Sequence, residues 1–440
     1  MGIFKAYDIR GMYPDEINEE LSRAIGNATA QVLGKRRLVV GRDMRPAAEP
    51  CTQALIEGIT DAGVDVVDIG LVSTPASYFA IGHYAFPGGV MCTASHNPPG
   101  YTGFKVSREE VKPVGSETGL HEIEELVSDK RYARAPRRGA VTTLDIWKNY
   151  EEHVLSFAEG IRPFRIAVDA GNGMVGKSGP PVFARLPGTF IGLYFELDGT
   201  FPNHEANPLK AENVRDLQRK VLEEKADLGA AFDGDGDRCA FIDEKGNMVG
   251  CDLVTALIGR EFLSHEKGAA IVYDLRSSRA TPETIRSAGG KPVRERVGHA
   301  FIKNTMREHN APFGGELSGH YYFRDNFFAD SGLIALVKML NVLSSEGKTL
   351  SELVTPLLRY SATGEINFEV KDKDAKIQEL ARTFHDGKID WLDGITVEYP
   401  DWWFNVRKSN TEPVLRLTLE AGTPQLRDKK KAELVKILST

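Results

Sequence analysis

The chain has 440 residues, of which 41% are hydrophobic and 27% charged, a composition typical of a soluble globular protein. At roughly 150 residues per domain, this length predicts about three domains. The formal net charge of −7 argues against a general nucleic-acid binder, so an anionic substrate would have to be bound by a local group of basic residues.

The cysteines and the apolar segments indicate the compartment. Cys51, Cys92, Cys239 and Cys251 have no CxxC spacing, which predicts buried thiols in a reducing cytosol. The start of the sequence lacks the apolar stretch of a signal peptide, and no long apolar run follows it. We therefore expect a cytoplasmic protein without a membrane partner.

Strand and helix patterns alternate through most of the chain. Residues 37–40 read as a strand, 51–62 as an amphipathic helix and 64–69 as the next strand. This βαβ order predicts parallel pairing. The apolar runs at 164–169 and 270–275 each indicate the first strand of a further α/β unit.

The character changes near residue 364. Before that, the charged, proline-containing stretch 128–139 is expected to run over the surface and to lead, through a helix, into a second domain. After residue 364, the alternation of apolar and polar residues predicts a small α+β domain with an antiparallel sheet covered on one face. Its expected strands are 365–370, 395–399 and 414–419, and its expected helices are 374–385 and 426–438.

A serine follows a predicted buried strand in the segment TASHNP at 93–98. Ser95 stands beside His96 and before an Asn-Pro turn signal, directly after the apolar run 87–92. A serine presented at the end of a strand is positioned as a nucleophile or a phosphoryl carrier. An ordinary polar turn is the structural alternative for this segment alone.

Three carboxylates alternate with glycine in DGDGDR at 233–238, namely Asp233, Asp235 and Asp237. Alternate side chains of an extended loop point the same way, and the glycines permit bends that bring them to one point. At an effective dielectric near 20, like charges ~4 Å apart repel by about 4 kcal/mol, so a bound divalent cation is expected. Oxygen ligands favour Mg²⁺.

Two alternatives apply to these aspartates. A calcium loop of the EF-hand type would fit them and Glu244, but Arg238 stands where that loop needs glycine. The flanks 228–232 and 239–242 also look like strands, with 244–247 as a turn between strands. A solvated acidic turn is the other alternative.

Two later segments add chemistry that binds sugars and phosphates. GELSGH at 315–320 places a carboxylate, a hydroxyl and an imidazole in a flexible loop, where Glu316 and Ser318 could bind vicinal sugar hydroxyls. RKSNTEP at 407–413 gathers a guanidinium and short polar side chains in one loop, and a planar guanidinium suits phosphate. A tight turn and a capped surface turn are the respective alternatives.

In this order, the motifs resemble those of the α-D-phosphohexomutases, the family of phosphomannomutase and phosphoglucomutase. The resemblance covers essentially the whole chain. It is carried by YDIRG at 7–11, GRDMR at 41–45, TASHNP, GFK at 103–105, DGDGDR, VGH at 297–299, GELSGH and RKSNTEP.

The resemblance implies a role for individual residues. Ser95 is the phosphoserine, and Asp233, Asp235 and Asp237 hold Mg²⁺ together with a phosphoryl oxygen on Ser95. The residues implied in catalysis or in lining the catalytic cleft are Arg10, His96, Lys105, His299 and His320. Those implied in substrate binding are Arg238, Arg276, Glu316 and Ser318, with Arg407, Ser409, Asn410 and Thr411 as a clamp for the non-reacting phosphate.

The resemblance also implies the fold class and the domains. We expect an α/β protein of three related α/β domains with mixed, largely parallel sheets, and a smaller α+β C-terminal domain, around a central cleft. The expected boundaries are 1–148, 149–250, 251–364 and 365–440. Relatives commonly have lysine at the position of Arg276, which puts a lysine-specific role there in doubt.

The expected reaction interconverts hexose 1-phosphate and hexose 6-phosphate, of mannose and/or glucose. Phosphorylated Ser95 would give a hexose 1,6-bisphosphate, which reverses in the cleft and also serves as activator. Lys105 and His96 are the candidates for the acid/base group. Hexose phosphates are the expected partners, the protein is expected to be a monomer or homodimer, and a mobile C-terminal domain would enclose the intermediate.

Three other functions remain open. A mutase for glucosamine phosphate or N-acetylglucosamine phosphate is the first, although Leu317 stands where relatives of that type typically carry glutamine. A serine phosphomonoesterase would transfer the phosphoryl group to water. A catalytically silent sugar-phosphate sensor would bind without turnover, but the serine and the three aspartates are intact.

Overall fold

The structure is a computed structural model that describes residues 2–409 and 413–439. It contains two compact units. Unit 1 comprises Met1–Val249 and Ser318–Ser351, and unit 2 comprises Gly250–Leu317 and Glu352–Thr440. Among the described residues, no helix is both long enough and apolar enough to cross a membrane.

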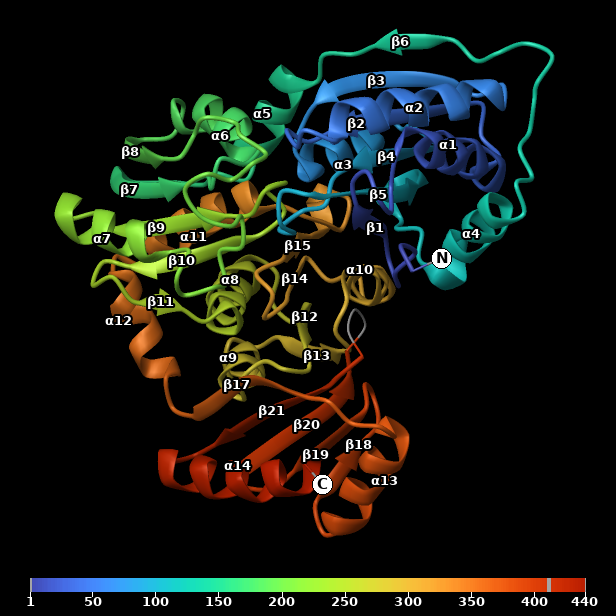
Figure 1. Ribbon diagram of the computed structural model, residues 1–440. Helices are drawn as coiled ribbons and strands as arrows, with labels where there is room; N and C mark the ends of the chain where they lie inside the picture. Colours follow the sequence, from blue (N-terminus) through green and yellow to red (C-terminus); the bar gives the residue numbers. More distant parts are fainter. Residues whose placement is uncertain (1, 410–412, 440) are drawn as a thin grey trace. The chain divides into compact units, whose positions relative to one another are not determined.

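Unit 1 begins with a mixed sheet in the strand order β1-β5-β4-β2-β3-β6, called sheet I here (Figure 1). Its elements are β1 (Ile9–Met12), α1 (Glu19–Leu33), β2 (Arg37–Arg42), α2 (Ala48–Asp61), β3 (Asp65–Leu71), α3 (Thr74–His83), β4 (Gly88–Cys92), β5 (Tyr101–Arg108), α4 (Leu120–Ser128) and β6 (Val141–Thr143). The predicted βαβ unit is confirmed, because β2 pairs in parallel with both β3 and β4. The helix begins at Ala48, three residues before its predicted start.

Sheet II of unit 1 has the order β11-β10-β9-β7-β8. Its elements are α5 (Trp147–Leu155), β7 (Phe164–Asp169), α6 (Val175–Phe183), β8 (Gly188–Leu193), α7 (Arg215–Glu224), β9 (Leu228–Phe232), β10 (Cys239–Asp243) and β11 (Met248–Val249). β7 pairs in parallel with β9, and β9 pairs antiparallel with β10. The acidic loop 233–238 therefore joins two buried strands, as predicted from its flanks.

The remaining part of unit 1 is an antiparallel hairpin followed by an apolar helix. These elements are β15 (Tyr321–Phe323), β16 (Ala329–Asp330) and α11 (Gly332–Glu346). In the sequence, unit 1 ends and unit 2 resumes within α12 (Leu350–Val354). Residues 332–343 of α11 are all buried. Because a helix that is apolar on all sides must be covered on all sides, α11 is part of the core of unit 1.

Unit 2 contains sheet III, in which β13, β12 and β14 are parallel neighbours in that order. Its elements are α8 (Cys251–His265), β12 (Ala270–Asp274), α9 (Ala280–Ser287), β13 (Lys291–Glu295), α10 (His299–Glu308) and β14 (Phe313–Gly315). The predicted strand at 270–275 is confirmed by β12. All five residues of β12 are buried, as expected for a central parallel strand.

Unit 2 also contains sheet IV, an antiparallel sheet in the order β17-β21-β20-β19-β18. Its elements are β17 (Ser361–Phe368), α13 (Lys373–Thr383), β18 (Lys388–Asp390), β19 (Ile395–Glu398), β20 (Trp402–Lys408), β21 (Leu415–Ala421) and α14 (Pro424–Leu438). Leu380, Phe384, Leu434 and Leu438 from the helical segments pack against apolar strand residues such as Phe404. The predicted antiparallel sheet covered on one face is confirmed (Figure 1).

The fold class is therefore α/β with mixed sheets and an antiparallel C-terminal sheet. One local prediction is wrong: Arg407 and Lys408 lie in β20 and not in a loop. β20 was missed because its sequence, WWFNVRK, mixes buried aromatic residues with Asn405 and Arg407 and so lacks simple apolar and polar alternation. The domain boundaries at 148, 250 and 364 remain predictions.

Candidate active site

The candidate serine lies just beyond the carboxyl end of β4. Ser95 is 1% exposed and has a φ of 49°, in the left-handed region that few residues other than glycine adopt. Its backbone N–H donates a hydrogen bond to Thr93 Oγ1 at 2.9 Å. Strained backbone of this kind persists only where its surroundings hold it.

Arg45 supplies much of that support. Its buried guanidinium donates hydrogen bonds to the backbone carbonyl oxygens of Ser95 at 2.8 Å and Asn97 at 2.6 Å. It also donates to the carbonyl oxygens of Pro98 at 2.8 Å and Tyr101 at 3.1 Å. Four contacts from one planar group therefore fix the course of the serine loop, residues 93–101.

The three aspartates of the acidic loop converge, as the sequence predicts. Asp233, Asp235 and Asp237 each offer a carboxylate oxygen within 4.8 Å of the others, and all three are buried. Ser95 Oγ donates a hydrogen bond to Asp233 Oδ2 at 2.8 Å. The nucleophile candidate and the acidic loop, 138 residues apart in sequence, thus share one site.

Glycine is required where the acidic loop meets the serine loop. A Cβ on Gly234 would lie 2.6 Å from the backbone oxygen of Ser95, closer than atoms of this kind approach. Gly236 has a φ of 76°, and its N–H donates to Asp233 Oδ1 at 3.1 Å. These two glycines let the loop turn its carboxylates toward Ser95.

Lys105 on β5 neutralises part of the acidic loop. Its ammonium donates to Asp235 Oδ2 at 2.8 Å and to Asp237 Oδ2 at 2.6 Å. Burial alone would lower the pKa of Lys105, but these two carboxylates raise it well above its usual value. Lys105 is therefore a cation here.

The aspartates retain capacity for a metal ion. Asp235 Oδ1 is buried and, within the described residues, accepts no hydrogen bond. Burial, followed by the charges of Asp237 and Asp235, raises the pKa of Asp233 well above its ordinary value. Burial also opposes the charge of Asp237, but Lys105 and His320 hold its pKa well below its ordinary value. The crowding around Asp233 and the unsatisfied Asp235 Oδ1 fit a divalent cation with oxygen ligands.

Histidines line the same site. His96 Nδ1 lies 3.3 Å from Ser95 Oγ. Burial, reinforced by the charges of Arg238 and Arg10, lowers the pKa of His96 well below its usual value. His96 is consequently neutral near pH 7 and able to accept a proton.

The GELSGH segment contributes His320 and Ser318 to unit 1. His320 Nε2 lies 3.4 Å from Asp237 Oδ1, and His320 Nδ1 lies 3.0 Å from Ser318 Oγ. Arg238 forms a β-bridge with His320, and Arg238 Nε lies 3.3 Å from His320 Nε2. Ser318 and His320 therefore lie beside the acidic loop, of which Arg238 is the last residue.

Arg10 reaches the serine loop from β1. Its guanidinium donates to Asn97 Oδ1 at 2.6 Å and pairs with Asp8 at 2.7 Å. Thr74, at the start of α3, donates from Oγ1 to Asp235 Oδ2 at 2.6 Å. Sequence reasoning missed Thr74, whose Thr-Pro context indicates only a helix start.

Unit 2 carries the remaining predicted residues. Glu316 is 2% exposed and accepts a hydrogen bond from the N–H of Gly298 at 2.9 Å, just before His299 begins α10. Asp274 binds both the Arg276 guanidinium, at 2.7 Å, and the N–H of Leu317, at 2.7 Å. These contacts gather Glu316, His299 and Arg276 at the carboxyl ends of the parallel strands of sheet III.

The structure describes two of the four residues of the predicted phosphate clamp, Arg407 and Ser409. Arg407 is 2% exposed and donates to Glu365 at 2.8 Å, and the N–H of Ser409 donates to the carbonyl of Val414 at 3.0 Å. Asn410 and Thr411 lie outside the described residues. Glu365 was not identified from the sequence, because an acidic residue in an alternating strand carries no distinguishing signal.

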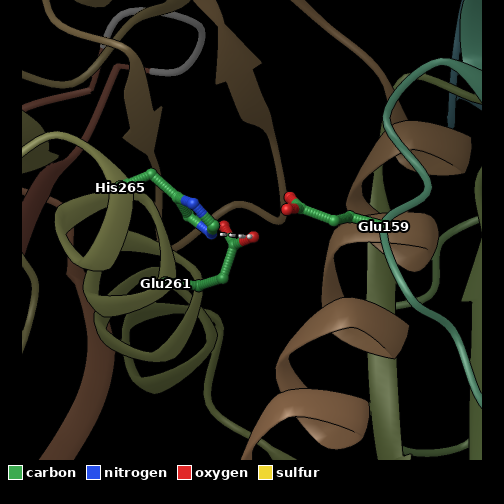
Figure 2. Close-up of side chains that lie close together, drawn as sticks. All are labelled: Glu159, Glu261 and His265. Atoms are coloured by element: carbon green, nitrogen blue, oxygen red, sulfur yellow. Dashed lines mark ion pairs between the residues drawn. The ribbon is translucent and has the colours of Figure 1, made fainter.

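One further acidic and histidine pair lies on α8. Figure 2 shows Glu261 and His265 one helical turn apart, with His265 Nε2 3.8 Å from Glu261 Oε1. The His265 side chain is 57% exposed. A partly exposed pair of this kind contributes little to stability, and we assign it no function.

Family models match the chain over nearly its full length. Those described as phosphoglucomutase/phosphomannomutase, alpha/beta/alpha domains I, II and III, match residues 1–134, 148–246 and 251–360. The model described as the phosphoglucomutase/phosphomannomutase C-terminal domain matches residues 365–437.

Individual proteins match over comparable lengths. A protein of Xanthomonas campestris pv. campestris named "Phosphohexose mutases" is 40% identical, with 99% of this chain and 98% of that protein covered. A phosphomannomutase of Escherichia coli is 39% identical, with 95% and 94% covered.

Solved structures share the fold. The crystal structure of a phosphoglucomutase/phosphomannomutase family protein from Burkholderia thailandensis has a TM-score of 0.92 at 33% identity and covers 99% of this chain and 97% of that one. Aspergillus fumigatus N-acetylphosphoglucosamine mutase, in complex with GlcNAc-6P and magnesium, has a TM-score of 0.66 at 14% identity. It covers 99% of this chain and 95% of that one, and at this identity the likeness concerns the fold alone.

Proposed function

The chain belongs to the phosphoglucomutase/phosphomannomutase family, a family of mutase enzymes of the isomerase class, and we propose that it interconverts the 1-phosphate and 6-phosphate of mannose and/or glucose. The observation that carries this proposal is the 2.8 Å hydrogen bond from Ser95 Oγ to Asp233 within the three-aspartate cluster. This contact joins a candidate phosphoryl carrier to a candidate metal site.

The proposed reaction begins with a phosphoryl group on Ser95. The bond from phosphorus to Ser95 Oγ breaks as a new bond forms to O6 or O1 of the hexose phosphate. The accepting hydroxyl loses its proton to a base, and Ser95 Oγ leaves as the alcohol or alkoxide. The product, a hexose 1,6-bisphosphate, then reverses its orientation so that its other phosphate is returned to Ser95.

The aspartates would hold Mg²⁺ together with a phosphoryl oxygen on Ser95. Bound there, the ion would polarise the phosphoryl group and offset its charge. The acidic donors, all oxygen, and the unsatisfied Asp235 Oδ1 support this ion.

Side chains of the protein are proposed for proton transfer and for neutralising charge. His96 is neutral and lies 3.3 Å from Ser95 Oγ, which makes it our candidate for the acid/base group beside the reacting oxygen. Lys105 is held as a cation, which favours a role in neutralising transferred charge over a role as base. Arg10 and Arg238 supply further positive charge beside the serine loop.

We assign the far end of the sugar phosphate to the remaining predicted residues. Glu316, with Ser318, would bind the sugar hydroxyls, and His299 and His320 would line the site. Arg276 and Arg407, with Ser409, Asn410 and Thr411, would bind the non-reacting phosphate. Leu317 favours a hexose over a glucosamine substrate.

A phosphorus NMR assay tests this assignment. The protein is supplied with Mg²⁺, trace glucose 1,6-bisphosphate and either mannose 1-phosphate or glucose 1-phosphate, and formation of the 6-phosphates is followed. We expect turnover by the wild type and loss of turnover in Ser95→Ala and Asp235→Asn. Release of inorganic phosphate in place of a 6-phosphate would instead identify a phosphomonoesterase, and binding without turnover would identify a sensor.

A further inference from the structure

The polar face of sheet IV brings arginine side chains together around one carboxylate. Arg407 on β20 lies directly opposite Arg416 on β21. Arg416 in turn lies opposite Asn367 on β17, and Glu365 is two residues before Asn367 on the same face. Like charges directly opposite each other destabilise a sheet, so this face requires a counter-charge.

Glu365 is that counter-charge. Its carboxylate lies 2.8 Å from Arg407 Nη2 and 3.1 Å from Arg416 Nη1. Arg276, just beyond β12, approaches it to 3.6 Å. Burial would raise the pKa of Glu365, but Arg276, Arg407 and Arg416 together lower it. Glu365 is therefore an anion held by guanidinium groups from three separate segments of unit 2.

The cluster is open on one side. The side chains of Arg407 and Arg276 are 2% and 8% exposed, whereas those of Glu365 and Arg416 are 24% and 21% exposed. An anion from solution would therefore approach the buried guanidinium groups past Glu365. Carboxylate and phosphate oxygens use the same forked donors of arginine, so the two anions compete.

We propose that Glu365 is a built-in competitor of the substrate phosphate. Its carboxylate keeps Arg407 and Arg416 together beside Arg276, which Asp274 holds at 2.7 Å, and it is displaced when the phosphate binds. This inference rests on the proposed function, which assigns Arg407 and Arg276 to the non-reacting phosphate. It adds Glu365 and Arg416 to that subsite.

Competition of this kind suits a reaction in which the bisphosphate intermediate must reverse its orientation. The clamp must release one phosphate and accept the other in every catalytic cycle. A clamp that binds phosphate too tightly would lower KM without raising kcat. Glu365, by re-forming its ion pairs as the phosphate leaves, would lower the barrier to release.

Direct binding measurements test the proposal in the full chain. Titration calorimetry with inorganic phosphate and with glucose 1-phosphate, both in EDTA, is performed on the wild type, Glu365→Gln, Arg407→Gln and the double variant. Glutamine keeps the shape and one acceptor but removes the charge. We expect Glu365→Gln to tighten binding about three- to tenfold, because a partly exposed charge is screened by solvent. The matched control, Glu369→Gln, removes an equal charge from an exposed residue nearby and should leave the affinity unchanged.

The four proteins separate this inference from the proposed function. We expect the gain from Glu365→Gln to disappear in the Arg407→Gln background. If Arg407→Gln binds both ligands like the wild type, the clamp assignment itself is wrong. If Arg407→Gln binds weakly but Glu365→Gln binds no more tightly than the wild type, the clamp stands and the competition is refuted.

Steady-state kinetics supply a second readout. Glu365→Gln should lower KM and kcat together, because tighter binding of the bisphosphate slows its release from the clamp. A purely structural role would lower kcat and raise KM or leave it unchanged. That pattern would overturn the proposal.

Discussion

Arg45 shows how one buried side chain can set the geometry of a reactive residue. Its guanidinium holds four carbonyl oxygens of the serine loop and also lies 5.0 Å from the centre of the Phe201 ring. Asp43 is its nearby counter-charge, 3.4 Å away. We therefore regard Arg45 as a positioning residue that acts through Ser95.

Arg45→Lys should test this role. Lysine keeps the charge but cannot reach four acceptors, so we expect kcat to fall about 100-fold, the usual cost of misplacing a reacting group by about 1 Å. KM for the sugar phosphate should change little, because Arg45 does not bind substrate in this account. A wild-type kcat in Arg45→Lys, or an unchanged kcat with a raised KM, would contradict the positioning role.

His96 should leave a signature in the pH dependence of stability. Its folded-state pKa is lowered by burial, whereas in the unfolded chain it is about 6.5. Below pH about 6.5 the unfolded state binds a proton that the folded state does not, so the free energy of unfolding falls as pH decreases. Urea unfolding in EDTA between pH 5 and 8 should show this slope in the wild type and a smaller slope in His96→Gln. Equal slopes would show that His96 is not buried in its neutral form.

At the scale of elements, the site depends on how closely two loops approach. Gly234→Ala would place a methyl group 2.6 Å from the backbone oxygen of Ser95 and so separate the serine loop from the acidic loop. We expect kcat to fall by at least about tenfold and the Mg²⁺ concentration for half-maximal activity to rise. Gly100→Ala is the matched control, since its Cβ would meet no heavy atom within 4 Å. Equal activity of the two variants would exclude a close approach of the loops.

The sequence predicts some elements better than others, for physical reasons. Strands β2 and β9 contain short apolar runs, and β3 contains Val66, Val67 and Ile69 between polar residues, so their existence can be read directly. β20 cannot be read in this way, because its polar residues Asn405 and Arg407 face other polar groups of unit 2 and are buried. Its pattern reflects tertiary contacts that no local rule contains.

The residues of the candidate site also fall into two groups, those in local motifs and those brought together by long-range packing. Ser95 and the three aspartates stand in compact motifs, and the family resemblance implied that the two motifs share one site. Thr74, Glu365 and the four-fold contact of Arg45 depend on long-range packing. Local spacing carries no information about those contacts.

For the whole molecule, the proposed reorientation of the bisphosphate intermediate requires a site that opens and closes. We predict that small-angle scattering profiles of the protein, recorded with and without glucose 1,6-bisphosphate, will differ, with the smaller radius of gyration in the bound state. The Ser95→Ala variant prevents turnover during the measurement. Profiles that superimpose would leave domain closure without support.

The most direct test of the central claim is a phosphate chase on residue 95. Protein treated with Mg²⁺ and glucose 1,6-bisphosphate is digested, and the peptide containing Ser95 is analysed by mass spectrometry before and after addition of excess glucose 1-phosphate or mannose 1-phosphate. We expect a single phosphate on Ser95 that exchanges with the sugar as fast as the enzyme turns over. Full turnover with an unmodified Ser95, or with the phosphate on another residue, would contradict it.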